Sequence, residues 1–179
     1  MDVLELIKKR RSVRDYLEKP VENDKLFKIL EAGRWSPSSG NVQNWRFIVI
    51  NNFREKAEIS EACLGQYWVS VAPIIIVVLS DDSKLRMLFG QRGEMSYSIQ
   101  NCSVAMQNMM LEAENLGLST SWVGAYDDDK ILRIVKVQDP NIIVRGIFTI
   151  GYAKSIPSPP NRLELDKLVY FNSWGNKYL

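Results

Sequence analysis

The sequence predicts an α+β domain, or a closely related mixed-sheet α/β domain, in which helices flank a mixed β-sheet. Segments with helical and strand patterns alternate along 179 residues, a length typical of one domain. The connections between them vary too much in length for a regular doubly wound fold. Residues 73–80 form an uninterrupted, mainly β-branched apolar run, which is typical of a strand buried on both faces. We therefore expect a single domain over residues 1–179.

The first part of the chain contains three predicted helices and one strand. Asp2 can cap a short helix, with Glu5 reaching back to the backbone of the cap. A second helix is expected over 23–33, where apolar side chains recur at helical spacing. After the polar loop SPSSGNVQN we expect a strand at 46–50 and a helix at 55–64.

Residues 93–116 form the longest predicted helix, and Gly117 follows as a C-terminal stop. An apolar stripe recurs along this helix at steps of three and four residues. Its members are Met95, Ile99, Cys102, Met106, Met109 and Ala113. Beyond the helix, the pattern predicts a strand at 119–125, a helix at 127–135 and a strand at 142–153. The remaining 25 residues carry prolines and then aromatic side chains, so we expect them to dock on their own domain or on a second copy.

The composition excludes several kinds of catalytic site. The chain has no histidine, which rules out Ser-His-Asp triads, Cys-His dyads, histidine zinc sites and a histidine base. Its two cysteines, Cys63 and Cys102, are too few for a cysteine-only zinc site and are expected to be buried small hydrophobes. A net charge of +2 is too small for a protein that mainly neutralises nucleic acid. If the protein is an enzyme, we expect a bound group to carry the chemistry.

Other short signals are absent or have structural explanations. The longest apolar run, 72–79, is far shorter than a bilayer span, and the N-terminus lacks a signal-peptide pattern, so we expect a cytoplasmic protein without membrane association. There is no P-loop and no GxGxxG. The three acids at 127–129 are expected to open a helix rather than to bind a metal.

The segment RRSVR is the first candidate binding feature. It places Arg10, Arg11, Ser12 and Arg14 just beyond the first predicted helix. Guanidinium groups match phosphate oxygens bidentately, and a serine hydroxyl adds a small partner, so the segment could bind a phosphate. The alternative is a solvated basic surface whose cations favour the C-terminus of the helix.

Three further segments could contribute to a ligand site. The loop WSPSSGNVQNW is dense in amides, which suit the edge of a planar heterocycle, although it could equally be an ordinary loop. Gly124, at the end of a predicted strand, either allows close packing or exposes backbone N–H groups. Arg162 becomes relevant only if the tail folds back toward the RRSVR segment.

In their order along the chain, these motifs resemble the nitroreductase family of FMN-dependent oxidoreductases, and the resemblance covers nearly the whole length. The motifs are RRSVRDY, SPSSGNVQNW, LGQYWVSVAPIIIVV, SIQNCSVAMQNMMLEAENLGL, SWVGAY and the tail from GYAK to FNSWG. The resemblance implies an α+β fold that forms an intertwined homodimer, with FMN at the subunit interface and residues 155–179 extending over the partner subunit.

The resemblance also implies roles for individual residues. Arg10, Arg11 and Ser12 would contact the FMN phosphate and ribityl chain, and Arg162 would contact the phosphate from the tail. Arg14 would lie near the pyrimidine edge of the flavin, where a cation stabilises negative charge. The partner subunit would contribute a loop that contains Pro37, Ser38, Ser39 and Asn41. Gln66 would place an amide near the ring. The backbone of Val123, Gly124 and Ala125 would lie beside the reactive nitrogen of the flavin.

The implied activity is hydride transfer from NADH or NADPH, through FMN, to an electron-poor acceptor such as a nitroaromatic or quinone, in a ping-pong cycle. Because the cofactor would carry the chemistry, this activity does not require a histidine. Members of the family commonly have Pro at the position of Asn44 and Asp at the position of Asn101. Two alternatives remain: a specialised relative that fragments flavin, removes halogen or dehydrogenates heterocycles, and a non-catalytic flavin-binding protein.

Overall fold

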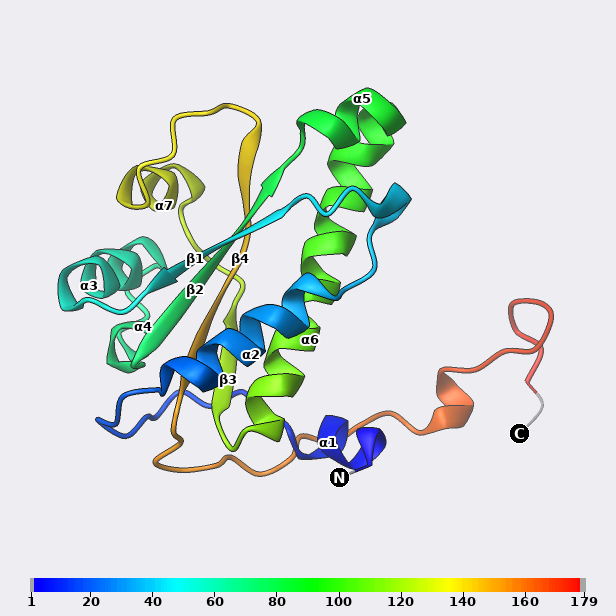
Figure 1. Cartoon of the computed structure of the whole chain (residues 1–179). Helices are drawn as coiled ribbons and strands as arrows, with labels where there is room; N and C mark the ends of the chain where they lie inside the picture. The colour runs from blue at the N-terminus through cyan, green and yellow to red at the C-terminus, as the bar shows by residue number, and fades with distance from the viewer. Residues whose placement is uncertain (1, 178–179) are drawn as a thin grey trace.

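The computed structural model describes residues 2–177, and its centre is a four-stranded antiparallel sheet in the order β1-β2-β4-β3 (Figure 1). The strands are β1 (Trp45–Ile50), β2 (Ile74–Asp81), β3 (Ser119–Val123) and β4 (Ile142–Gly151). The α+β class is confirmed. All three strand pairings are antiparallel, however, where we expected a mixed sheet. After β1, helices α3 (Phe53–Ala62) and α4 (Trp68–Val71) bring the chain back to the end of the sheet where β1 stopped. Strand β2 therefore starts beside the end of β1 and runs antiparallel to it.

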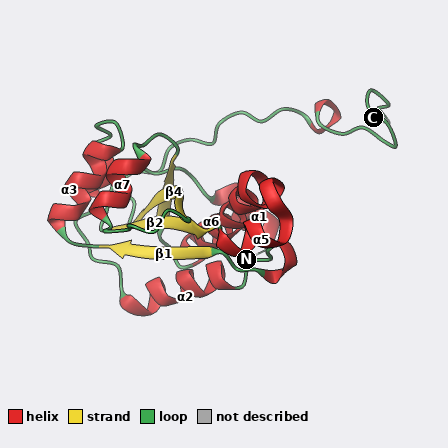
Figure 2. Ribbon diagram, turned by 90° about the horizontal axis from the view of Figure 1, so that it is seen from above, coloured by secondary structure: helices red, strands yellow, loops and turns green. Residues whose placement is uncertain are grey.

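Helices cover both faces of the sheet (Figures 1 and 2). On one face lie α2 (Asn23–Arg34) and the long α6 (Ser98–Asn115). On the other lie α3 (Phe53–Ala62), the one-turn α4 (Trp68–Val71) and α7 (Asp128–Ile134).

Strand β2 lies between these two helical layers. Its side chains alternate between two hydrophobic clusters, with Ile74 and Ile76 facing α2 and α6, and Ile75 and Val77 facing α3 and α7. The prediction of a strand buried on both faces is therefore confirmed. This burial makes the sheet a rigid platform for the segments at its edges.

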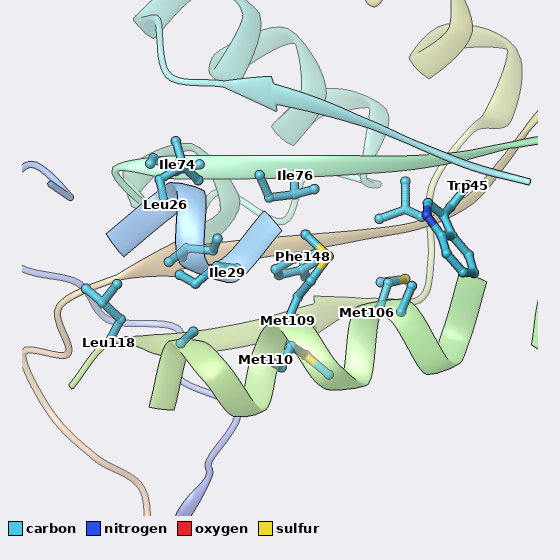
Figure 3. Packing of buried hydrophobic residues seen from close by; sticks show 14 of the residues in the cluster. Leu26, Ile29, Trp45, Ile74, Ile76, Met106, Met109, Met110, Leu118 and Phe148 are labelled. Atoms are coloured by element: carbon cyan, nitrogen blue, oxygen red, sulfur yellow. The ribbon is translucent and has the colours of Figure 1, made fainter. Parts of the chain in front are cut away.

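Methionines on α6 pack directly against the sheet and against α2 (Figure 3). A Cβ atom at Gly33 of α2 would lie 2.6 Å from Met109 Sδ, and one at Gly146 of β4 would lie 2.5 Å from Met106 Sδ. A side chain at either position would therefore displace the methionine side chain that packs there. The core role expected for Met106 and Met109 is confirmed, because both side chains are fully buried.

The N-terminal part of the predicted long helix differs from expectation. A π-helical turn, η2 (Gly93–Tyr97), precedes α6, and a helix that the pattern did not predict, α5 (Ser83–Arg92), comes before it. Gly90, with φ of +56°, interrupts the regular helical backbone of α5. Met95 and Ile99 belong to the expected apolar stripe but are 63% and 46% exposed. Met95 lies in η2 and Ile99 in the first turn of α6, both before Cys102, the first residue of α6 in the hydrophobic core cluster.

The first helix, α1 (Val3–Lys9), forms without the expected cap. The side chain of Asp2 makes no capping hydrogen bond, and Glu5 instead accepts one from Lys8 Nζ at 3.1 Å. Glu5 and Lys8 are neighbours on the helix surface, so the ion pair replaces the capping contact. The other predicted elements begin and end within two residues of their expected positions, and Gly117 ends α6 with φ of +75°.

The last segment leaves the body of the domain after passing α1 (Figures 1 and 2). It contains a single short 3-10 turn, η3 (Leu165–Lys167), and exposes Leu163, Leu165 and Trp174. Within residues 2–177, no helix has both the length and the apolar character needed to cross a membrane.

Candidate functional site

The basic segment 10–14 is held in an extended conformation beside β3. Ser12 and Thr120 form an isolated parallel bridge, and Val13 N donates to Thr120 O at 3.0 Å. Val13 and Tyr16 point inward and are buried, and the Tyr16 hydroxyl donates to Val13 O at 2.7 Å. Side chains alternate along an extended segment, so burying Val13 turns Ser12 and Arg14 outward.

Arginines from both ends of the chain meet at one opening of about 360 Å³. Its lining comes from the basic segment and from the proline-rich start of the tail, and consists of Arg10, Arg11, Ser12, Pro157, Ser158, Pro160 and Arg162. The tail therefore folds back beside the RRSVR segment, which is the arrangement that makes Arg162 relevant to a ligand site. This opening is where the candidate site collects its positive charge.

The arginines at the opening differ in the hydrogen bonds that their side chains make. Arg11 donates to the carbonyls of Lys9 and Arg10 at 3.1 and 2.9 Å, so it satisfies the end of α1, as the structural alternative expects. Within residues 2–177, neither Arg10 nor Arg162 donates a side-chain hydrogen bond to the protein. Burial lowers the pKa of Arg10. The charge of Glu114 raises this pKa in part, and the charges of Arg11 and Arg162 lower it further. The donor set of this opening therefore fits a multiply charged oxyanion such as a phosphate.

A second group of candidate residues lies farther along β3. Gln66 Nε2 donates to Cys63 O at 2.9 Å and to Ala125 O at 3.2 Å, which ties the turn before α4 to the end of β3. Arg14 lies over the ring of Trp68, with its guanidinium carbon 5.4 Å from the ring centroid.

The backbone between these two groups is continuous and open. Val123 is buried, whereas Gly124 and Ala125 are exposed, and a Cβ atom at Gly124 would meet nothing within 4 Å. From Thr120, beside the arginine opening, to Val123 is about 10 Å of extended strand. The site is thus elongated, with a cationic end at the opening and an amide-bearing end near Gly124.

The loop that contains Pro37, Ser38, Ser39 and Asn41 lies elsewhere in the same chain. Its short 3-10 turn, η1 (Ser39–Asn41), is attached to the start of α6, where Ser39 N and Oγ donate to Asn101 Oδ1 at 3.1 and 3.2 Å. The arginine cluster is near the other end of α6, where Lys9 pairs with Glu114. The helix rises about 20 Å from Asn101 to Glu114. A single chain therefore does not bring this loop to the arginines.

A buried polar network near this loop was missed by the sequence analysis. Asp82 is fully buried and pairs with Arg145 Nη2 at 2.5 Å. Serine and asparagine side chains link this ion pair to the loop, and they are Ser80, Ser98, Asn44 and Asn101. These residues are scattered from position 44 to 145. Asn44, Ser98 and Asn101 lie within the motifs SPSSGNVQNW and SIQNCSVAMQNMMLEAENLGL, but no motif contains Ser80, Asp82 or Arg145, so only the topology of the sheet reveals their contact.

Two other expectations concern the acids and the thiols. Asp127 Oδ1 accepts from Lys130 N at 3.0 Å, which confirms that the acidic run opens α7. Among residues 2–177, no group of three acidic or cysteine side chains is arranged to hold a metal. Cys63 and Cys102 are both completely buried, as expected for small hydrophobic residues.

The fold and this elongated site define an α+β domain with an arginine-lined opening at the edge of an antiparallel sheet. A sequence model of the nitroreductase family matches residues 7–152. A Methanothermobacter thermautotrophicus protein with the provisional name NADH dehydrogenase/NAD(P)H nitroreductase is 34% identical over 176 residues, covering 93% of this chain and 88% of its own. The chain belongs to the nitroreductase family.

Solved structures agree with this assignment. A nitroreductase family protein from Clostridium difficile 630 has a TM-score of 0.84 and 32% identity, with 97% of this chain and 99% of the other covered. An FMN-dependent nitroreductase from Clostridium difficile R20291 has a TM-score of 0.82 and 29% identity, with 96% and 99% covered. The family resemblance on the sequence motifs is thereby confirmed.

Proposed function

We propose that this protein is an FMN-dependent oxidoreductase that uses NADH or NADPH to reduce an electron-poor acceptor such as a nitroaromatic or a quinone. Family membership supports an NAD(P)H-dependent flavin enzyme, as do relatives such as the FMN reductase [NAD(P)H] of Bacillus subtilis, which is 28% identical over 135 residues. The observation that carries the proposal is the convergence of Arg10 and Arg162 on one opening, where neither guanidinium donates a hydrogen bond to the described part of the chain.

The residues at the opening fit the phosphate of FMN. Arg10 and Arg162 would bind its oxygens through charge-assisted hydrogen bonds, and the outward hydroxyl of Ser12 would add a neutral donor. Arg11 would contribute mainly its charge, because its donors already serve the end of α1. Bringing together three guanidinium groups is unfavourable without an anion, and a phosphate would remove that repulsion.

The other end of the site fits a planar ring. When bound, FMN supplies the hydride chemistry that links NAD(P)H to the acceptor. Arg14, held over Trp68, would stabilise negative charge that develops at the ring edge. Gln66 holds Ala125 O, and this contact would orient the exposed backbone of residues 124 and 125 toward the ring. No side-chain base is needed for these roles, which suits a chain without histidine.

We further propose that the working form is a homodimer. The loop at 37–41 lies about 20 Å from the arginines of its own chain, so a second copy would have to supply it to the site. Exposed apolar side chains on α2, directly after α2 and on α6 support such an interface, and they include Phe27, Trp35, Ile99 and Val104. The tail that leaves the domain would extend over the partner subunit.

Turnover separates this proposal from a non-catalytic flavin-binding protein. The protein reconstituted with FMN should oxidise NADH or NADPH in the presence of a quinone, and double-reciprocal plots at several quinone concentrations should be parallel, as in a ping-pong cycle. A reconstituted, yellow protein that consumes neither nucleotide with quinone or nitroaromatic acceptors would contradict the enzymatic role. Production of a flavin fragment or a dehalogenated product would favour a specialised relative.

A further inference from the structure

Two buried amides connect the Ser39 loop to a buried ion pair. Asn101 Nδ2 donates to Asn44 Oδ1 at 2.7 Å, and Asn44 Nδ2 donates to Ser80 Oγ at 2.6 Å. Asn44 is 1% exposed and Asn101 5%, so water does not replace these contacts. The path from the ion pair to the loop therefore runs through protein groups alone.

The buried carboxylate of Asp82 determines which way each amide faces. A carboxylate paired with Arg145 only accepts hydrogen bonds, so Ser80 must direct its single proton to Asp82 Oδ1. Ser80 Oγ then has only lone pairs for Asn44, which must present its NH₂ group there. Asn44 consequently turns its oxygen toward Asn101.

The same logic extends to the loop. Asn101 must turn its NH₂ group to the oxygen of Asn44, which leaves its own oxygen facing Ser39. That oxygen accepts from both Ser39 N and Ser39 Oγ. If the amide of Asn101 were reversed, its NH₂ group would oppose the N–H of Ser39, and the loop would lose its attachment to α6.

We propose that Asn44 and Asn101 are positioning residues, and that the directed path Asp82–Ser80–Asn44–Asn101 sets the conformation of the Ser39 loop. This inference rests on the proposed function in one respect: the loop positioned in this way is the one expected to reach the cofactor of the partner subunit. Asn44 makes no hydrogen bond to Ser39, and its side chain is linked to the Ser39 attachment through the amide of Asn101. Asn44 also follows Ser39 along the backbone of the same loop, so the effect of Asn44 has to be compared with and without Asn101 to isolate the side-chain route.

The test compares Asn44→Leu in two backgrounds by measuring hydrogen exchange of the Ser39 amide. Alone, Asn44→Leu frees the amide of Asn101 to turn, and exchange at Ser39 should become about tenfold faster relative to core amides of β2. Combined with Asn101→Asp, the same substitution should not accelerate exchange, because a carboxylate presents an acceptor to Ser39 in either orientation. If Asn101→Asp fails to fold, Asn101→Leu serves as the background, where Asn44→Leu should add nothing.

A matched control lies on the same helix. Asn108 Nδ2 donates to Ser36 Oγ at 2.8 Å, so Asn108→Leu removes another bond between α6 and this loop without touching the path to Asp82. Exchange at Ser39 should stay within about twofold in this variant. Equal acceleration by Asn108→Leu and Asn44→Leu would overturn the inference, as would unchanged exchange in Asn44→Leu.

Binding of FMN by the apoproteins provides the second readout. Asn44→Leu should weaken FMN affinity by about tenfold, and the double variant with Asn101→Asp should recover it. Faster exchange at Ser39 with unchanged affinity would overturn the positioning role. If even the unaltered protein fails to bind FMN, the proposed function fails, while the exchange measurements alone still decide whether the two asparagines set the loop.

Discussion

Ser12 and Thr120 form a single parallel bridge, and this one pairing places the basic segment along the edge of an otherwise antiparallel sheet. The bridge turns Ser12 outward beside Arg10 while Val13 is buried beneath it. The cationic opening and the exposed end of β3 thus share one backbone framework. Substitutions that loosen this framework should affect both the stability of the fold and binding at the opening.

Tyr16→Phe is the first such substitution. The Tyr16 hydroxyl donates to Val13 O and lies 2.6 Å from Thr149 Oγ1, inside the protein. Its removal takes the hydroxyl donor from Val13 O, while Thr149 Oγ1 keeps its bond to Ser121 O, so the free energy of unfolding should fall by about 1–2 kcal/mol in urea titrations. The hydroxyl of the half-buried Tyr126 has no hydrogen-bond partner in the described chain, so Tyr126→Phe should be nearly neutral. Similar losses in the two variants would contradict this role for Tyr16.

Arg145→Met should be much more damaging than loss of a surface arginine. It leaves the completely buried carboxylate of Asp82 without its cation, which should cost about 3–5 kcal/mol of unfolding free energy. Arg86 also forms an ion pair, with Glu94, but the pair is exposed, so Arg86→Met should cost less than about 1 kcal/mol. Adding Asp82→Asn to Arg145→Met should recover part of the loss. Equal effects of the two arginine variants in chemical denaturation would refute the prediction.

The two thiols should be unreactive in the folded protein. Burial raises the pKa of both Cys63 and Cys102 to about 12, so almost no thiolate is present at pH 8. A thiol reagent such as Ellman's reagent should therefore modify both cysteines in urea and neither within minutes in the native state. Rapid modification of a native cysteine would show that its surroundings open easily.

The raised pKa values also predict a pH dependence of stability. The unfolded thiols lose their protons near pH 9, whereas the folded thiols keep them until about pH 12. Between these values the unfolded state binds fewer protons, so the free energy of unfolding should fall as pH rises. The double variant Cys63→Ala, Cys102→Ala should show a shallower fall in urea midpoints across this range. An identical slope would contradict this contribution of the thiols.

Sedimentation tests the proposed dimer. Two chains of 20.6 kDa should sediment together, and Ile99→Asp, on the exposed side of α6, should shift the protein toward monomer. Phe53→Asp is the matched control, because Phe53 is also exposed but begins α3 on the opposite face of the sheet. A monomer that retains full FMN affinity would contradict a site between subunits.

Local patterns predicted much of the fold. The uninterrupted β-branched run that became β2 and the three- and four-residue spacing of the methionines on α6 both indicated burial directly. Helix α5 was missed because its apolar and polar residues show no clear helical periodicity and Gly90 interrupts its backbone. Met95 and Ile99 fit the helical pattern yet are exposed in the chain, since periodicity cannot tell whether an apolar face meets its own core or another molecule.

The candidate site was predictable only where its residues are adjacent in sequence. RRSVR is compact enough to indicate anion binding, and Arg162 joins it because the tail runs back past α1. The network around Asp82 was not predictable, because Asp82 and Arg145 lie outside the motifs and no local pattern pairs them with the serines and asparagines that they contact. Their contacts follow from the pairing of β2 with β4 and from the placement of α6 across the sheet.

Comparing FMN with riboflavin most directly tests whether the arginine opening binds the cofactor phosphate. The two ligands share the ring and ribityl chain and differ only in the phosphate. Fluorescence titration of the apoprotein should give an affinity for FMN about 100-fold higher than for riboflavin, and Arg10→Ala with Arg162→Ala should abolish most of that difference while leaving riboflavin affinity unchanged. The same FMN preference in the unaltered protein and the double variant would contradict a phosphate site at Arg10 and Arg162.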